Sequence, residues 1–117
     1  RYYNGSSWSD QIYISTKVNM HRNEQSYVSS AIDSQDNIHV VWQGEGGDTE
    51  AKTQIWYALN NGSWSTPLRI SNRTGMDTVE NQLEPAIAID GNDTVHVVWA
   101  GVASGQSFPT QLIYYSN

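Results

Sequence analysis

Apolar and polar residues alternate in short runs along this chain, at residues 12–14, 38–42, 54–57, 68–70 and 95–99. No stretch keeps apolar residues at helical spacing for more than two turns. Short alternating runs are typical of β-strands that bury one face, and here they are separated by turn-forming Gly, Asn, Asp and Ser. The pattern therefore predicts an all-β protein of short strands.

The sequence also repeats itself at a shift of 57 residues. Residues 31–33 match 88–90, residues 38–42 match 95–99, and residues 54–55 match 111–112. After one residue of slippage, Trp8-Ser9 and Ile14-Ser15 recur as Trp64-Ser65 and Ile70-Ser71. An internal period of roughly 40 to 60 residues, with several short strands per unit, indicates β-propeller blades.

The expected strands are enough for two four-stranded blades in one unit, 1–117. They form a fourth strand at 9–15, a complete blade at 27–71 and the first three strands of another blade at 84–115. Two blades cannot close a ring, and alone they would leave apolar faces and strand edges in water. We therefore expect a homo-oligomer, with three chains supplying six blades. The alternative is a segment of a longer propeller.

The repeat has four characteristic segments: Glu-Pro-Ala-Ile-Ala-Ile-Asp at 84–90, Val-His-Val-Val-Trp at 95–99, Gln-Ile-Trp-Tyr at 54–57 and Asn-Gly-Ser-Trp-Ser-Thr-Pro-Leu-Arg-Ile-Ser at 61–71. Together they resemble the repeat of sialidase-like β-propellers, in which the turn before the fourth strand carries the Asp-box. The chain has the Gly, Ser and Trp of that turn twice, with Asn in place of Asp: Gly62, Ser63 and Trp64, and Gly5, Ser7 and Trp8. The resemblance implies propeller blades over almost the whole chain, and it specifies a fold better than an activity.

The composition excludes several functional classes. The chain has 6 Lys and Arg against 12 Asp and Glu, a net charge of −6, which argues against binding to nucleic acid or to anionic membranes. It has no Cys for a disulfide framework or a thiolate metal site. The longest apolar run is about five residues, too short for membrane insertion. Because the alternative is a repeat segment of a cell-surface propeller protein, we expect an extracellular or cell-surface location.

Two kinds of connection are expected at opposite ends of the blades. Short turns lie at 33–37 and 90–94, whereas longer loops lie at 16–26, 44–52, 72–83 and 101–109. Because strands alternate in direction, the long loops share one end, where binding groups commonly lie. The expected ligand contacts there, nearest the central channel, are Arg22, Gln25, Gln82 and Glu84. Arg22 can hold a carboxylate or two hydroxyls bidentately.

The histidines and turn carboxylates are expected to be structural. His39 and His96 occupy matching strand positions a whole blade apart, so they cannot share a metal and are interpreted as packing between blades. Asp90, Asn92 and Asp93 could bind calcium, but their turn lacks the further ligands of a calcium loop. We therefore expect no metal and no cofactor.

A sialidase-type site needs three arginines, a tyrosine nucleophile with its glutamate, and an aspartate acid/base. Only Arg22 and Arg73 lie in the long loops, so we expect no catalytic residues. We expect instead a non-catalytic module that binds carbohydrate by stacking aromatic rings on sugar faces, or alternatively a structural or protein-interaction repeat. The candidate rings are Trp56, Tyr57, Phe108, Tyr114 and Tyr115, although Trp42, Trp56 and Trp99 also fit a blade core.

Overall fold

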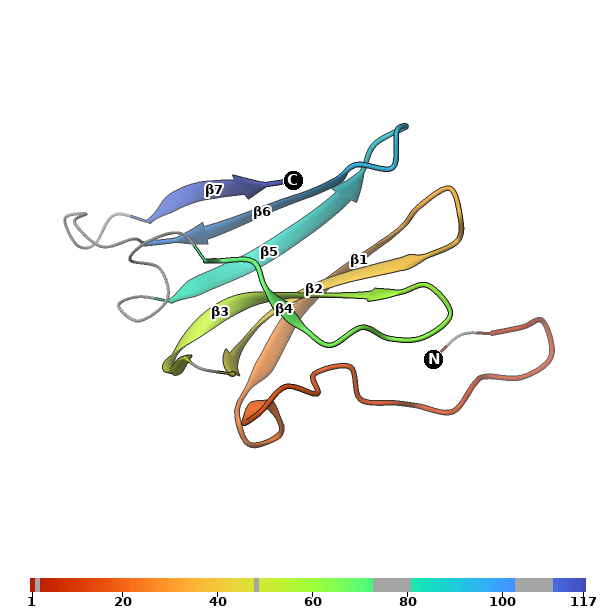
Figure 1. Cartoon of the computed structure of the whole chain (residues 1–117), viewed down its shortest axis with the longest axis horizontal. Coiled ribbons are helices and arrows are strands. Elements are labelled where there is room, and N and C mark those ends of the chain that lie inside the picture. Colours follow the sequence, from red (N-terminus) through yellow and green to blue (C-terminus); the bar gives the residue numbers. More distant parts are fainter. Residues whose placement is uncertain (2, 48, 73–80, 103–110) are drawn as a thin grey trace.

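The computed structural model describes residues 1, 3–47, 49–72, 81–102 and 111–117, and it contains two antiparallel β-sheets (Figure 1). The first sheet contains, in spatial order, β1 (Gln25–Ile32), β2 (Ile38–Gly46), β3 (Thr49–Asn60) and β4 (Leu68–Arg69). The second contains β5 (Gln82–Ile89), β6 (Val95–Gly101) and β7 (Leu112–Ser116). One turn of 3-10 helix, η1 (Met20–Arg22), precedes β1. The predicted all-β class is confirmed.

The two sheets correspond to the predicted units at 27–71 and 84–115. In the described part of one chain they form no closed ring, so completion of a ring stays a prediction. Among the same residues, no helix has the length and apolar character needed to cross a bilayer.

In each sheet, the first two strands are joined by a tight turn that an aspartate closes. Asp33 Oδ1 accepts hydrogen bonds from two backbone N–H groups of its own turn, at 2.9 and 2.8 Å, and Asp90 Oδ1 accepts two at 2.9 Å. Asp36 and Asp93 have left-handed backbone, with φ of 62° and 61°. Aspartate suits both roles because its short carboxylate bonds nearby backbone groups. The short turns predicted at these places are confirmed.

The sequence repeat is also a repeat of the backbone. β1 and β5 have an irregular register at the same place, where Tyr27 and Glu84 adopt positive φ of 50° and 55°. The third strands, β3 and β7, align differently in the structure than in the sequence. The sequence match of 54–55 with 111–112 is one residue out of register with the structural alignment. Trp56 lies opposite Trp42, and Tyr114 lies opposite Trp99, so Tyr114 is the counterpart of Trp56. This register places a large ring beside the tryptophan of the neighbouring strand, where cross-strand rings pack well.

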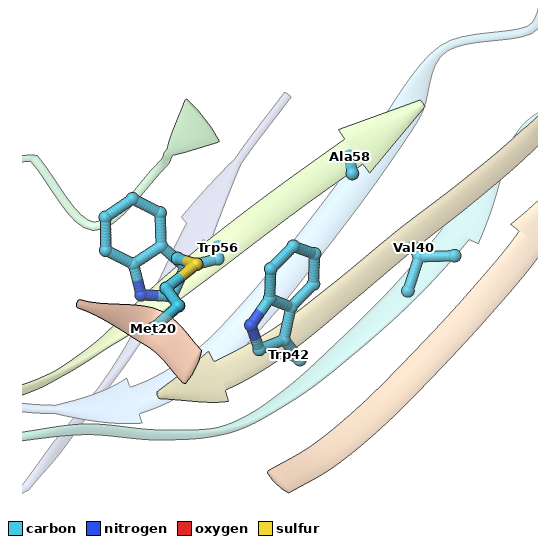
Figure 2. Close-up of a cluster of buried hydrophobic side chains, with 5 residues drawn as sticks. All are labelled: Met20, Val40, Trp42, Trp56 and Ala58. Atoms are coloured by element: carbon cyan, nitrogen blue, oxygen red, sulfur yellow. The ribbon is translucent and has the colours of Figure 1, made fainter. Parts of the chain in front are cut away.

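Apolar side chains on the two faces of β2 form two clusters. The inter-sheet cluster consists of Val41, Ile55, Val97 and Trp99 and contains residues of both sheets. The outer cluster, on the other face of the first sheet, consists of Met20, Val40, Trp42, Trp56 and Ala58 (Figure 2). Consecutive strand residues point to opposite faces, so neighbouring valines of β2 serve different clusters. The inter-sheet cluster packs the sheets together, and η1 covers part of the outer cluster through Met20.

Residues 9–15, predicted as a fourth strand, form no strand in one chain. Their pairing in an assembly stays a prediction. A strand needs a partner with unpaired N–H and C=O groups, and the outer edge of β3 is already paired with β4. Ile14 instead packs against the outer cluster, so the segment lies on the side of the first sheet away from the second (Figure 1). The fourth strand of the first sheet is also shorter than expected, only Leu68–Arg69.

The long loop predicted at 44–52 is also wrong, because β2 and β3 continue into a tight hairpin. Gly46 and Gly47 have φ of 141° and 66°, which glycine adopts without a steric penalty. The predicted loop at 16–26 contains η1 and the beginning of β1.

The other two predicted loops, 72–83 and 101–109, fall largely on residues 73–80 and 103–110, which lie outside the described residues, as do Arg73 and Phe108.

Candidate functional site

The four predicted ligand residues lie at one end of the sheets, opposite the aspartate-closed turns (Figure 1). Gln25 and Gln82 begin β1 and β5, Glu84 lies two residues into β5, and Arg22 ends η1. Arg22 is exposed, and its Nε donates a hydrogen bond to Nε2 of the adjacent His21 at 3.2 Å. The structure therefore places all four at the predicted end, but it gives them different roles.

Gln25 is fixed inside the first sheet. Its Oε1 accepts a hydrogen bond from the indole Nε1 of Trp42 at 2.8 Å, and its Nε2 donates to the carbonyl oxygen of Glu45 at 2.7 Å. Gly44 provides the space, because a Cβ at that position would lie 2.1 Å from the Gln25 oxygen. The Gln25 side-chain amide thus provides a hydrogen-bond partner both for a buried tryptophan and for a carbonyl near the end of β2.

Gln82 repeats this arrangement in the second sheet. Its Oε1 accepts from Trp99 Nε1 at 3.0 Å, its Nε2 donates to the Val102 carbonyl at 2.8 Å, and its side chain is 0% exposed. A Cβ at Gly101 would lie 1.9 Å from the Gln82 oxygen. A buried amide bonded at both ends is a structural group. We therefore leave Gln25 and Gln82 out of the proposed binding site.

Glu84 and Tyr27 share a second repeated feature at this end. Both are exposed and occupy the positive-φ position of a strand irregularity. The backbone N–H of Glu84 donates to Gln43 Oε1 at 2.7 Å, and Gln43 Nε2 donates to Ser26 Oγ, next to Tyr27, at 3.4 Å. Gln43 therefore links the two strand irregularities across the sheets. Sequence reasoning missed Tyr27, although its position 57 residues before Glu84 marked it.

Each sheet also contains an Asp–His–Tyr triad that sequence reasoning missed. His39 Nε2 lies 3.2 Å from Asp33 Oδ2, and its Nδ1 lies 2.8 Å from Tyr57 Oη. In the second sheet, His96 makes the same contacts with Asp90 at 3.3 Å and with Tyr115 at 2.8 Å. The available signal was an aspartate six residues before a histidine in both repeats.

The electrostatics of the triads favour a structural role. Burial raises the pKa of Asp33, but hydrogen bonds from Asn37, His39 and Gln35 outweigh it and lower that pKa to about 2. Backbone bonds from the turn and the bond from His96 lower the pKa of Asp90 to about 2. Burial, and then the charge of Asp33, raise the pKa of Tyr57. Through these hydrogen bonds the first triad connects the Asp33 turn with β2 and β3.

Two of the three residues considered as calcium ligands, Asp90 and Asp93, accept hydrogen bonds from protein donors. Asp90 bonds its own turn, and Asp93 accepts hydrogen bonds from the backbone N–H and the hydroxyl of Ser34 in the other sheet. In the described part of the chain, no group of three or more His, Asp or Glu side chains is arranged to hold a metal ion.

The aromatic candidates divide into core and surface residues. The core interpretation is confirmed for the buried tryptophans Trp42, Trp56 and Trp99. Tyr114 stacks on Trp99 with ring centroids 5.9 Å apart, and Tyr57 is half-buried. Tyr115 is exposed. Of the predicted stacking rings that the structure describes, only this one is largely open to solvent.

Comparison with protein-family models, curated proteins and solved structures finds no match to this chain. The resemblance to sialidase-like propellers therefore stays a prediction.

Proposed function

We propose that this chain is a non-catalytic, carbohydrate-binding module built from two propeller blades. The first sheet would be a complete blade, and the second would be a blade of which the described residues form three strands. The observation that carries the binding proposal is the exposed pair of Tyr27 and Glu84 at the same end of the two sheets.

The chemistry of this pair suits a sugar. The Tyr27 ring, 61% exposed, offers a flat apolar face, and the Glu84 carboxylate can accept hydrogen bonds from hydroxyl groups. A positive φ is costly for tyrosine and glutamate, and such strained positions cluster at binding sites. The hydrogen bonds of Gln43 hold the two positions in a fixed relation. Arg22 adds a cationic group at the same end.

The absence of catalysis is part of the proposal. The Asp–His–Tyr triads are the most chemically distinctive side-chain groups among the described residues, and they recur in both sheets at matching positions. A device present once per blade, with a raised tyrosine pKa in the first sheet, fits a fold element better than an active site.

Completion of the ring by further copies is the remaining part. It is supported by an apolar face of the second sheet that one chain leaves uncovered, with Val98, Ile113 and Tyr115 exposed. The same face supports a second candidate function, a structural or protein-interaction repeat, because exposed apolar patches mark interaction surfaces.

A glycan array followed by calorimetry tests the binding proposal. Replacing Tyr27 by Ala, or Glu84 by Gln, should weaken binding to a selected glycan at least tenfold, about 1.4 kcal/mol. Tyr3→Ala is the matched control, since Tyr3 is also exposed but lies in the turn before Trp8 at the other end. If the chain retains no glycan, or if the control weakens binding as much as Tyr27→Ala does, the proposal fails and the interaction repeat is favoured.

A further inference from the structure

Strand β7 has a free edge in the part of the chain that the structure describes. In the first sheet β3 lies between β2 and β4, whereas β7 pairs with β6 alone. An open edge presents N–H and C=O groups to any strand that fits. The first sheet shows the fitting register, with Leu68 opposite Tyr57 and Arg69 opposite Trp56.

Residues 8–15 have the sequence and local geometry of a fourth strand, and among the described residues no strand pairs with residues 12–15. The antiparallel bridge between Tyr3 and Trp8 corresponds to that between Asn60 and Trp64. The backbone N–H of Thr16 donates to the carbonyl of Ile14 at 2.9 Å, and Asn72 donates to Ile70 at the same distance. Two exposed apolar residues lie between these features, Ile12 and Tyr13. The segment is therefore shaped like β4 and its flanking turns.

The segment cannot reach β7 of its own chain in this structure. Ile14 packs against the outer cluster, on the face of the first sheet that is turned away from the second sheet. The first sheet therefore stands between residues 12–15 and the open edge (Figure 1). Pairing requires another molecule.

We propose that copies of this chain associate head to tail, with residues 12–15 of one copy added as the fourth strand on β7 of the next. This inference rests on the proposed ring assembly and identifies its seam. The β4 register, transferred to β7, places Ile12 opposite Tyr115 and Tyr13 opposite Tyr114. It also directs the N–H of Ile14 to the Ile113 carbonyl, as Ile70 donates to Ile55 at 2.9 Å.

A cleft between the sheets fits the incoming Tyr13. This register places Tyr13 on the same face as Tyr114, which packs against the inter-sheet cluster. Two residues along the same face, Ser116 lines a cleft of about 310 Å³ between the sheets, together with Arg69 and Val97. Tyr13 is 87% exposed in one chain, and the seam would bury its ring in this cleft.

The uncovered face of the second sheet fits the same partner. Val98 and Ile113 are 41% and 75% exposed, whereas their counterparts Val41 and Ile55 are fully buried by the second sheet. A second copy that docks its first sheet here would cover this face as the second sheet covers the first. The seam would thus resemble the interface between the two sheets of one chain.

Engineered disulfides test the register, because the chain has no native Cys. The variant Ile12→Cys with Tyr115→Cys places two exposed positions opposite each other, with Cα atoms about 5.5 Å apart, within disulfide range. The control, Tyr13→Cys with Tyr115→Cys, puts its thiols on opposite faces of the added strand. After mild oxidation, the first variant should form at least tenfold more covalent multimer than the control.

Light scattering of the unmodified chain completes the test, and it should give the mass of two or more chains, three for a ring of six blades. Equal cross-linking of the two variants, or a chain that stays monomeric, overturns the proposal and leaves the β7 edge to another partner. Glycan binding is measured separately with Glu84→Gln, because Glu84 lies at the contact between the two sheets of one chain and not at the seam. Loss of the seam with binding retained, or the reverse, therefore shows which proposal failed.

Discussion

Adding one methyl group beside the buried Gln82 of the second sheet should have a large effect on stability. In Gly101→Ala the new Cβ would lie 1.9 Å from Gln82 Oε1, so the amide must move. Movement breaks its hydrogen bonds with Trp99 Nε1 and the Val102 carbonyl, at 3.0 and 2.8 Å. A net hydrogen bond is worth about 1 kcal/mol, and a buried donor left unsatisfied costs about 1–3 kcal/mol. We expect Gly101→Ala to lower the free energy of unfolding by about 2–4 kcal/mol.

Gly91→Ala is the matched control, because no atom lies within 4 Å of a Cβ at Gly91. It should change stability by less than about 0.5 kcal/mol. Urea unfolding at one fixed protein concentration measures both variants, since association would shift the midpoint. In the background Gln82→Ala the clash is absent, so Gly101→Ala should cost much less there. Equal stability of Gly101→Ala and Gly91→Ala would refute the structural role of the glutamine.

Two further predictions concern acid and the seam. The folded structure lowers the pKa values of Asp33 and Asp90 from 3.8 to about 2. The two ionised carboxylates therefore stabilise the fold fully above pH 4, and this stability is lost as the pH falls toward 2. Urea midpoints between pH 5 and 2 should fall less steeply for Asp33→Asn with Asp90→Asn than for the unmodified chain, and parallel curves would contradict this. In Ile113→Pro, the lost N–H is the counterpart of the Ile55 N–H that donates to Ser71 Oγ on the fourth-strand side. Multimers should therefore disappear in light scattering while circular dichroism stays unchanged, and an unchanged mass would argue against the seam.

The strand pattern was predictable because its physical causes are local. Alternating side chains specify a strand with one buried face, and an aspartate followed by polar residues closes a short turn through its own hydrogen bonds. Both signals recur in the two halves, as in the turns at Asp33 and Asp90. The sheets and the turns between their first two strands were therefore anticipated.

The roles of individual polar residues were harder to predict, because they depend on contacts between strands. From the sequence, Gln25 and Gln82 were predicted to be exposed loop residues. In the structure, Trp42 and Trp99, each 17 positions later, bring indole N–H groups to them. The strand predicted at 9–15 depends on such a contact too. Its sequence is that of a fourth strand, but a ladder requires a partner, and the described part of one chain shows no strand paired with residues 12–15.

The seam would not be as strong as the internal interface, because the repeat is imperfect at the contact residues. Between the two sheets of one chain, Gln43 accepts a hydrogen bond from the Glu84 N–H at 2.7 Å. In the proposed seam the counterpart of Gln43 would be Ala100, which has no side-chain acceptor for the Tyr27 N–H of the next copy. One hydrogen bond between sheets would therefore be missing there.

The turns at the other end of the sheets would also form fewer hydrogen bonds at the seam than within one chain. Ser34 donates both its backbone N–H, at 2.9 Å, and its hydroxyl to the Asp93 carboxylate, a contact between the sheets of one chain. In the proposed seam, Gly91 would stand in place of Ser34 and would face Asp36 of the next copy, so it would offer a backbone N–H but no hydroxyl. Hydrogen bonds to a charged group contribute about 1.5–3 kcal/mol each. Dilution should therefore open the seam while the two sheets of each chain stay packed together.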